Sequence, residues 1–500
     1  MKHFSPAMIL IGAALAISVP LSAENFLDVV EEAQNTINRK YPDESSIARK
    51  LATEELEKIA RSNKSEAEKI AAIREKFSDA MADLVKAAEG GDADAQCQLG
   101  ECYEDGEGVK KDMVEAAKWY LKAAEQGHAR AQFCLGVCFD EGEGVRQDKL
   151  EAANWYRKSA EQGYDKAQFN LGCCYVFGEL GDPDMAEAAK WFRKAAEQGH
   201  VSAQFNLGVQ YANGDGVEKD LSEAAKWYLK AAEQGDSTAQ YNIGVCYEDG
   251  EGVGIDLVKA AGWYRKAADR GNADAQFRLG GCYRQGDGVK KDLVEAAKWY
   301  LKAAEQGQVF AQFNIALCYD LGDGVARDAV EAVKWYRKAA EQGNVDAQMN
   351  LAIAYSDGDG VDMDKAEAVK WFLKAAEQNH PGAQYSLGLA YARGEGVKKD
   401  MSEAAKWYRK AAEQGHALAQ NNLGIRYITG DGVEQDAVEA AKWFRLSAEQ
   451  GNMNAQFNLG AMYANGDGVD MDKAEAVKWL RKAAEQGHEG AKELLEKLGA

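Results

Sequence analysis

One pattern of apolar and polar positions recurs along most of the chain at intervals of 36 residues. The dipeptide Ala-Gln marks this pattern, from Ala95-Gln96 to Ala455-Gln456. All eleven tryptophans mark it as well, and they stand at Trp119, Trp155, Trp191, Trp227, Trp263, Trp299, Trp335, Trp371, Trp407, Trp443 and Trp479. A fixed period of this length is typical of repeat proteins, in which each repeat stacks on the next.

The first repeat, residues 92–127, predicts a pair of helices. Ala95, Leu99 and Tyr103 lie on one stripe of a helix with about 3.6 residues per turn. Gly100, beside that stripe, leaves room for a second helix to approach closely. The first helix is therefore expected to bury one face against a partner helix in the same repeat.

Glycine and aspartate mark the turn between the two helices. Gly106 and Gly108 permit the backbone to turn at the end of the first helix. Asp112 then caps the second helix, and Glu115, three residues later, is expected to complete a capping box. The second helix is predicted to end at Gly127, because glycine readily adopts the left-handed backbone of a C-terminal cap.

The second helix carries the largest apolar side chains of the repeat. Its predicted core positions are Ala116, Trp119, Tyr120, Ala123 and Ala124. A buried tryptophan removes about 150–250 Å² from water, and a single pair of helices cannot cover such a ring, so neighbouring repeats must stack. We therefore predict an all-α solenoid of eleven helix-turn-helix repeats, in which the tryptophans are structural and do not stack on nucleic-acid bases.

This repeat resembles the Sel-one-like repeat (SLR) family, whose members are relatives of tetratricopeptide repeat proteins. The shared pattern is Leu99-Gly100-Tyr103, Gly106-x-Gly108-Val109, Asp112, Ala116-Ala117 and Ala123-Ala124-Glu125-Gln126-Gly127. The resemblance continues to Gly487, and it implies a right-handed α/α superhelical solenoid with an adaptor or scaffold function. The third hairpin, residues 178–183, lacks the second glycine-valine pair, which would allow a local change of curvature.

The repeats occupy residues 92–487, and the flanking segments are assigned from their composition. Residues 24–91 are charged and rich in Ala, Glu, Lys and Ile, so we expect an N-terminal helical segment and cap. Residues 488–500 begin another first helix, but Glu496 occupies the place of the small residue. A charged residue there would block further stacking, and we therefore expect a C-terminal capping helix.

Residues 1–23 resemble a secretory signal peptide. A basic start precedes an apolar run over residues 8–19, and Ala23 provides a small residue for cleavage. Leu21 fits the cleavage pattern poorly, so an uncleaved anchor is the alternative. The run is too short to span a bilayer comfortably, and no later segment is apolar enough to do so. We expect a periplasmic or secreted protein without stable membrane insertion once the signal is removed.

Composition and charge narrow the classes of partner. The chain is 46% hydrophobic, which suffices for a buried core, and its formal net charge is −21. Sustained nucleic-acid binding needs clustered cations that displace counterions, so no nucleic-acid partner is expected. Such acidity is typical of a soluble surface, and a preference for basic partners is the alternative.

One side of each first helix faces away from the predicted core. Resemblance to tetratricopeptide repeats makes this side concave and ligand-facing. It comprises the positions equivalent to Asp94, Cys97, Glu101, Glu104 and Asp105. The position of Cys97 is aromatic in most later repeats, at Phe133, Phe169, Phe205, Tyr241, Phe277, Phe313, Tyr385 and Phe457. Beside it runs a series of asparagines, at Asn170, Asn206, Asn242, Asn314, Asn350, Asn422 and Asn458.

Two interpretations of these side chains compete. In the first, the rings fill the seam between adjacent first helices, and the asparagines satisfy local polar groups. In the second, they form a groove whose apolar rings and amide groups hold an extended peptide. Replacing Phe205 and Tyr241 by serine distinguishes the two, because the first interpretation predicts lost thermal stability and the second predicts lost binding by a folded protein.

Few residues offer catalytic or metal-binding chemistry. The five histidines beyond residue 23 share one inter-repeat position, at His128, His200, His380, His416 and His488. This distribution indicates loop composition. No serine is followed by lysine three residues later, as a serine β-lactamase requires, and the acids of the hairpins do not reproduce the spacing of an EF-hand. We therefore expect no enzyme activity, no metal and no cofactor.

Nine cysteines are an odd number for an exported protein, so at least one has no partner within the chain. Six share one position, at Cys102, Cys138, Cys174, Cys246, Cys282 and Cys318. Equivalent stacked helices lie about 8–10 Å apart, which exceeds the reach of a disulfide, so we expect these six to be small buried residues. Pairing across repeats stays open for Cys97, Cys134 and Cys173.

The favoured function is an exported scaffold or adaptor that binds a protein or peptide partner on the concave face of the solenoid. Resemblance to the cysteine-rich secreted members of the SLR family implies a first alternative, a secreted β-lactam-binding or β-lactamase-like enzyme. The second alternative is an exported effector that acts on a host cell.

Overall fold

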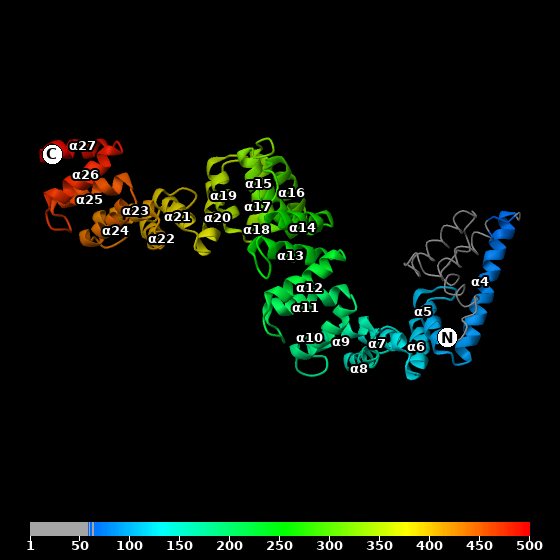
Figure 1. Cartoon of the computed structure of the whole chain (residues 1–500). Coiled ribbons are helices and arrows are strands. Elements are labelled where there is room, and N and C mark those ends of the chain that lie inside the picture. The colour runs from blue at the N-terminus through cyan, green and yellow to red at the C-terminus, as the bar shows by residue number, and fades with distance from the viewer. Residues whose placement is uncertain (1–58, 60, 63–64) are drawn as a thin grey trace. The chain divides into compact units, whose positions relative to one another are not determined.

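The computed structural model describes residue 59, residues 61–62 and residues 65–500, and these residues form helices and turns with no strand (Figure 1). The chain divides between Ile255 and Asp256 into two compact units. The helices of the first unit are α4 (Glu66–Glu89), α5 (Ala93–Asp105), α6 (Met113–Glu125), α7 (Ala129–Glu141), α8 (Lys149–Glu161), α9 (Asp165–Phe177), α10 (Met185–Glu197), α11 (Val201–Asn213), α12 (Leu221–Glu233) and α13 (Ser237–Asp249).

The helices of the second unit are α14 (Leu257–Asp269), α15 (Ala273–Gln285), α16 (Leu293–Glu305), α17 (Val309–Leu321), α18 (Ala329–Glu341), α19 (Val345–Asp357), α20 (Lys365–Glu377), α21 (Pro381–Arg393), α22 (Met401–Glu413), α23 (Ala417–Thr429), α24 (Ala437–Glu449), α25 (Met453–Asn465), α26 (Lys473–Glu485) and α27 (Glu489–Leu498). Within each unit, every helix packs on the helices before and after it in the chain. From α5 to α26, odd-numbered helices are the first helices of the repeats and even-numbered helices are the second. The predicted all-α solenoid of helix-turn-helix repeats is confirmed.

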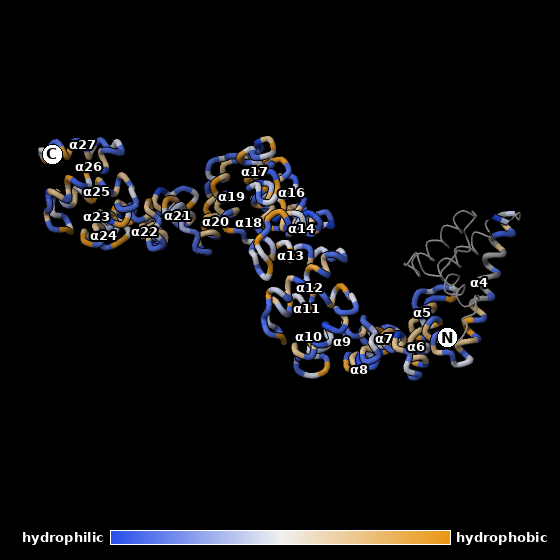
Figure 2. The backbone as a smooth tube through the Cα atoms, in the orientation of Figure 1, coloured by the Kyte–Doolittle hydropathy of each residue, from blue (hydrophilic) through white to orange (hydrophobic). Residues whose placement is uncertain are grey.

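Apolar residues recur at regular intervals along the helices of each unit (Figure 2). In the repeat formed by α7 and α8, Leu135 and Tyr156 are each 1% exposed. Gly136 allows this approach, because a Cβ at that position would lie 2.7 Å from the ring of Tyr156. The expectation that this glycine, the equivalent of Gly100, makes room for the second helix is confirmed.

The tryptophans are structural, as predicted. Eight of them are only 4–8% exposed, and Trp119, Trp263 and Trp443 are half-buried. A lysine three residues later lies over ten of the eleven rings, and Nζ of Lys158 is 3.6 Å from the ring centroid of Trp155. Trp443 is the exception, because Leu446 stands at that position. This cation–π contact covers the solvent side of an indole that the helices enclose on its other sides.

Aspartate caps the second helix of each repeat. Oδ1 of Asp112 accepts hydrogen bonds from the N–H groups of Val114 and Glu115, at 3.0 and 3.1 Å. The predicted capping box is wrong, because the carboxylate of Glu115 accepts instead from Nζ of Lys118 at 2.6 Å. The N–H of Asp112 already donates to the carbonyl oxygen of Tyr103 at 2.8 Å, so it does not need Glu115.

The interpretation of the histidines as loop composition is also wrong. Each of the five histidines in the described part of the chain caps the helix that follows it, and Nδ1 of His128 accepts from the N–H of Ala131 at 3.1 Å. The same capping bond is made by His200, His380, His416 and His488, and in other repeats by Asp92, Asp236, Asn272, Gln308, Asn344 and Asn452. The position therefore favours a side chain with a hydrogen-bond acceptor, and the exception is Tyr164, which makes no capping bond.

The two glycines of each hairpin have different tasks. Gly142 ends α7 with a left-handed φ of 76°. Gly144, with a φ of 75°, also lies against the preceding repeat, because a Cβ there would be 1.9 Å from the carbonyl oxygen of Met113. In the third hairpin Leu180 takes this place, and the turn forms around Gly181, whose φ is 131°. The second glycine therefore fixes the fit between repeats as well as the turn.

The two ends of the repeat array are helical. The 24-residue helix α4 packs on α5, and Leu84 and Ala88 are each 1% exposed at that contact. At the other end, α27 buries Leu495 and leaves Glu496 exposed. The expected signal at residues 1–23 lies outside the described residues, as does most of 24–65. No helix in the described part of the chain has the length and apolar character needed to cross a membrane.

Candidate functional site

The predicted aromatic residues lie on the first helices and are half-buried. Phe169 packs on Phe192 of its own second helix, with ring centroids 5.7 Å apart. It also stacks on His200 at the start of the next first helix, at 4.7 Å. Rings at Phe133, Phe205, Phe277, Phe313 and Tyr385 contact the equivalent aromatic ring of their own second helix. These rings therefore pack on the second helix of their own repeat. Each ring is only half-buried, and we call the side of the repeats formed by the first helices the first-helix face.

Four of the predicted asparagines, Asn170, Asn242, Asn350 and Asn422, form a hydrogen bond with the tyrosine of the preceding repeat. Burial raises the pKa of Tyr156, and a hydrogen bond with Asn170 opposes that shift. Burial likewise raises the pKa of Tyr228 to about 12, and a hydrogen bond with Asn242 acts in the opposite direction and lowers that pKa. Asn314 differs, since its Oδ1 accepts from Arg284 of the preceding repeat at 3.2 Å. The asparagines thus join successive repeats next to the first-helix face.

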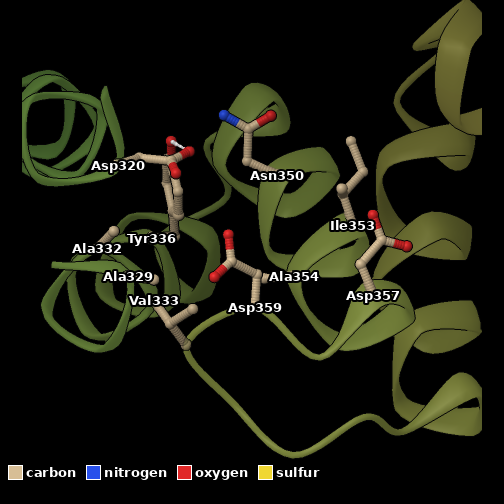
Figure 3. A pocket seen from close by; sticks show the side chains of 10 residues that line it. All are labelled: Asp320, Ala329, Ala332, Val333, Tyr336, Asn350, Ile353, Ala354, Asp357 and Asp359. Atoms are coloured by element: carbon tan, nitrogen blue, oxygen red, sulfur yellow. Dashed lines mark hydrogen bonds between the residues drawn. The ribbon is translucent and has the colours of Figure 1, made fainter. Parts of the chain in front are cut away.

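A cavity of about 210 Å³ opens where α17, α18 and α19 meet (Figure 3). Its lining comprises Asp320, Ala329, Ala332, Val333, Tyr336, Asn350, Ile353, Ala354, Asp357 and Asp359. The buried Tyr336 donates a hydrogen bond from its hydroxyl to Oδ2 of Asp320 at 3.1 Å. Asn350, Ile353 and Asp357 project from α19 on the other side of the opening. The cavity therefore combines a deep polar group with an apolar residue at its rim.

The same cavity occurs at two other junctions. The cavity between α5, α6 and α7 measures about 250 Å³ and is lined by Glu104, Met113, Phe133, Cys134, Val137, Cys138, Glu141 and Glu143. The cavity between α21, α22 and α23 measures about 350 Å³ and is lined by Ala392, Lys399, Met401, Tyr408, Asn422, Arg426 and Asp431. Cys134, Asn350 and Asn422 occupy equivalent positions, separated by multiples of the repeat length. We call these three cavities the junction pockets.

The charge of the junction pockets varies between repeats. Around the α17–α19 pocket, Nη2 of Arg327 lies 2.7 Å from Oδ2 of Asp359 and 3.9 Å from Oδ1 of Asp320. The α21–α23 pocket contains cations instead, and Nη1 of Arg426 lies 3.4 Å from Oδ2 of Asp431. The junction pockets therefore lie at equivalent places in the backbone but carry different charged side chains.

The sequence predicted part of this site. Of the predicted ligand-facing residues, Glu104, Phe133, Asn350 and Asn422 line junction pockets. Tyr336 was missed, because its position was assigned to the core by analogy with Tyr120. Its hydroxyl was the available signal, since a buried tyrosine needs a hydrogen-bond partner that phenylalanine, present at Phe192, does not.

The acids of the hairpins do not form a metal site in this structure. Among the residues that the structure describes, no group of three or more His, Cys, Asp or Glu side chains is arranged to hold a metal ion. In the α17–α19 pocket, Asp320 and Asp359 instead pair with Arg327, and Asp320 also accepts the hydrogen bond of the Tyr336 hydroxyl.

The Sel1 repeat family model matches eleven successive segments of the chain. They are residues 93–128, 129–164, 165–200, 201–236, 237–272, 273–308, 309–344, 345–380, 381–416, 417–452 and 454–488. The chain belongs to the Sel1 repeat family. This finding confirms the resemblance inferred from the sequence, and the matched segments coincide with the helix pairs from α5 to α26.

Solved structures of other Sel1 repeat proteins resemble this chain. One is c5321, described as a protective antigen present in uropathogenic Escherichia coli strains and displaying an SLR fold. It is 40% identical, the match covers 83% of this chain and 90% of that chain, and the TM-score is 0.77. A Sel1 repeat protein from Oxalobacter formigenes is 36% identical over 49% of this chain and 96% of that chain, with a TM-score of 0.43. A search of curated proteins found no match.

Proposed function

We propose that this Sel1 repeat protein is an exported scaffold that binds an extended segment of a partner protein along its first-helix face. The observation that carries the proposal is the recurrence of one junction pocket at equivalent places, between α5 and α7, between α17 and α19, and between α21 and α23. Within the second unit, a segment that crosses the first helices from α17 to α23 would meet two such pockets. Repeat solenoids offer extended surfaces of this kind to protein partners.

The surface around the α17–α19 pocket supports this proposal. Ile353 is 40% exposed at the rim, and Leu321, next to Asp320 in the chain, is 63% exposed. Exposed apolar side chains gain free energy when a partner covers them. Tyr336 and Asn350 supply a hydroxyl and an amide below the rim, and a few such polar groups in an apolar site fix the orientation of what binds there.

The exported location rests on the composition of residues 1–23. The E. coli relative is described as a protective antigen, and this description supports export of this chain as well. Fractionation of producing cells tests the location. Protein lacking residues 1–23 in the periplasm or medium would support export, whereas full-length protein confined to the cytoplasm would contradict it.

Site-specific photocrosslinking in producing cells tests the binding surface. A photoreactive phenylalanine analogue at Ile353 should give an adduct of defined mass. The matched control is Lys334 on α18, which is exposed and pairs only locally with Glu331 in the described contacts. Asn350→Ala should lower the yield at Ile353. Equal adducts at both positions, or no adduct at Ile353 or at the equivalent Val137 and Ile425, would contradict the proposal.

A further inference from the structure

Two cysteines face each other across the junction between the first two repeats. Cys97 on α5 is 2% exposed, and Cys134 on α7 packs against the same cluster of buried residues. A hydrogen bond between the two thiols, followed by burial, raises the pKa of the Cys97 thiol. Cys134 also lines the junction pocket between α5 and α7. One thiol of the pair is therefore enclosed, and the other is reached from the pocket.

The same two positions are in contact elsewhere in the chain. Asn421 and Asn458 stand at the positions of Cys97 and Cys134 in the last two repeats. Nδ2 of Asn458 donates a hydrogen bond to Oδ1 of Asn421 at 3.2 Å. The stacking of successive first helices therefore brings these two positions together, whichever side chains occupy them.

This pair differs from the six cysteines that share a single position. Those six are confirmed as small buried residues, with exposures of 1–8%, and each is one full repeat or more from the next. Cys97 and Cys134 instead lie on adjacent first helices and are 37 residues apart, one residue more than a repeat. This difference of one position can bring their sulfur atoms closer together than two equivalent positions would be. Both are thiols in the structure.

We propose that Cys97 and Cys134 form a disulfide across this junction when the protein meets a disulfide-containing oxidant. The thiolate of Cys134, reached through the pocket, attacks one sulfur of the oxidant and releases the other as a thiol. The sulfur of Cys97 then attacks Cys134 in the mixed disulfide, a second oxidant thiol leaves, and one sulfur–sulfur bond remains in the protein. Oε1 of Glu101 accepts a hydrogen bond from Sγ of Cys97 at 3.9 Å, and the proton that Cys97 loses goes to the departing oxidant thiolate.

The consequence is a covalent link between the first two repeats. A crosslink stabilises a fold chiefly by restricting the unfolded chain, so the oxidised protein should unfold at a higher denaturant concentration than the reduced protein. The link also replaces the free thiol of Cys134 in the wall of the α5–α7 pocket. An oxidising compartment, which the composition of residues 1–23 predicts, would favour the linked form.

Thiol mapping of the full chain tests the proposal. The purified protein is incubated with oxidised glutathione, denatured, alkylated, digested and examined by mass spectrometry. The expected result is a peptide pair joined through Cys97 and Cys134, with seven of the nine cysteines alkylated (nine less the linked pair). Cys173→Ser is the matched control, because Cys173 is partly buried and lies at another junction; this variant should keep the linked pair.

The variants also separate a lost crosslink from a lost fold. Cys134→Ser changes only the partly exposed partner, and its helical circular dichroism should match that of the parent while the crosslink disappears. Complete alkylation of Cys97 and Cys134 after oxidation would overturn the proposal. So would a crosslink from Cys134 to Cys138, or identical unfolding of the oxidised and reduced forms.

Discussion

Nε2 of Gln126 donates a hydrogen bond of 2.8 Å to Oε1 of Gln96, which lies on the other helix of the same repeat. Gln96 is 5% exposed, and its own Nε2 donates to the carbonyl oxygen of Ala88 at 3.0 Å. One buried amide thus joins the end of the preceding helix to the second helix of its own repeat. Equivalent glutamine pairs are Gln132–Gln162, Gln168–Gln198, Gln204–Gln234, Gln276–Gln306, Gln312–Gln342, Gln348–Gln378, Gln384–Gln414, Gln420–Gln450 and Gln456–Gln486.

Gln312→Met tests the contribution of these pairs to stability. Gln312 is 4% exposed, donates to Ala304 at 3.2 Å and accepts from Gln342 at 2.8 Å. Methionine has a similar length but leaves both partners without their hydrogen bonds, so the free energy of unfolding should fall by about 1–3 kcal/mol. Urea unfolding followed by circular dichroism measures the change.

The exposed partner supplies the second single variant. Gln342→Met should also lower the free energy of unfolding, because it leaves Oε1 of the buried Gln312 without its donor. The double variant should then cost less than the sum of the single variants, since residues in one hydrogen-bond network are coupled. Additive costs would show that the glutamines do not act as a pair.

Two glycines of one hairpin should respond differently to alanine. Gly322 and Gly324 both have a left-handed φ, of 76° and 75°. A Cβ at Gly322 would have its nearest neighbour 3.6 Å away, whereas a Cβ at Gly324 would lie 1.9 Å from the carbonyl oxygen of Leu293 in the preceding repeat. Gly322→Ala should therefore lower the free energy of unfolding by about 1–2 kcal/mol, because alanine does not readily adopt the left-handed backbone.

Gly324→Ala should carry the same backbone cost and, in addition, about 1–3 kcal/mol for displacing the neighbouring repeat. Thermal unfolding of the two variants, compared with the parent, measures the difference. Equal losses of stability would mean that the hairpin does not press on the preceding repeat in solution.

The histidine caps predict a dependence of stability on pH. Burial lowers the pKa of His200 and of His416 below the usual pKa of a histidine. The unfolded chain therefore binds protons more readily than the folded chain, and stability must decrease as pH falls. The contribution of these caps is fully present above about pH 6.5 and is lost as pH falls through the folded pKa, because a protonated Nδ1 cannot accept the N–H of Ala203 or Ala419.

His200→Asn should remove this dependence and keep the cap, since asparagine already caps the equivalent helix at Asn272. The stabilities of parent and variant should agree near pH 8 and diverge below pH 6.5, by no more than the ~1 kcal/mol that such a cap contributes. Asn272→His is the reciprocal test and should introduce the dependence. Parallel stability profiles over this range would contradict the assignment.

The repeat architecture could be predicted because each repeat carries residues whose role is local. Gly136 sits where only a hydrogen atom fits beside Tyr156, and Trp155 needs more cover than one repeat provides. Both requirements follow from the size of a side chain and the period of a helix. The helix pairs and their stacking were therefore evident without coordinates.

The junction pockets and the caps depend on relationships that the period alone does not reveal. A junction pocket is formed by three helices from two repeats, and Tyr336, Asn350 and Asp320 reach it from different elements. The capping role of His128 becomes visible only when its position is compared with Asp92 and Asn272, whose shared property is an acceptor atom. The recurring Ala-Gln dipeptide marked the repeat. The hydrogen bonds of its glutamine could not be predicted, because one of the partners is a carbonyl group at the end of the preceding helix.

Phe205 can separate the two roles of the aromatic positions. It is half-buried, and its ring centroid lies 5.9 Å from that of Tyr228. Phe205→Ser should lower the free energy of unfolding by about 1–2 kcal/mol, because it removes the apolar ring that packs on Tyr228. Phe205→Leu keeps most of the apolar area and should change stability by less than about 1.5 kcal/mol.

The leucine variant then reports on binding in a folded protein. Val209 lies one helical turn after Phe205 on the first-helix face, and a photocrosslinker there would detect a partner held against α11. We expect Phe205→Leu to reduce the crosslink at Val209, because leucine lacks the flat ring that a partner segment would contact. The contrary outcome is a crosslink that persists in Phe205→Leu while Phe205→Ser lowers the free energy of unfolding. In that case the rings contribute only to packing between helices, and the partner must be held by the polar groups of the junction pockets.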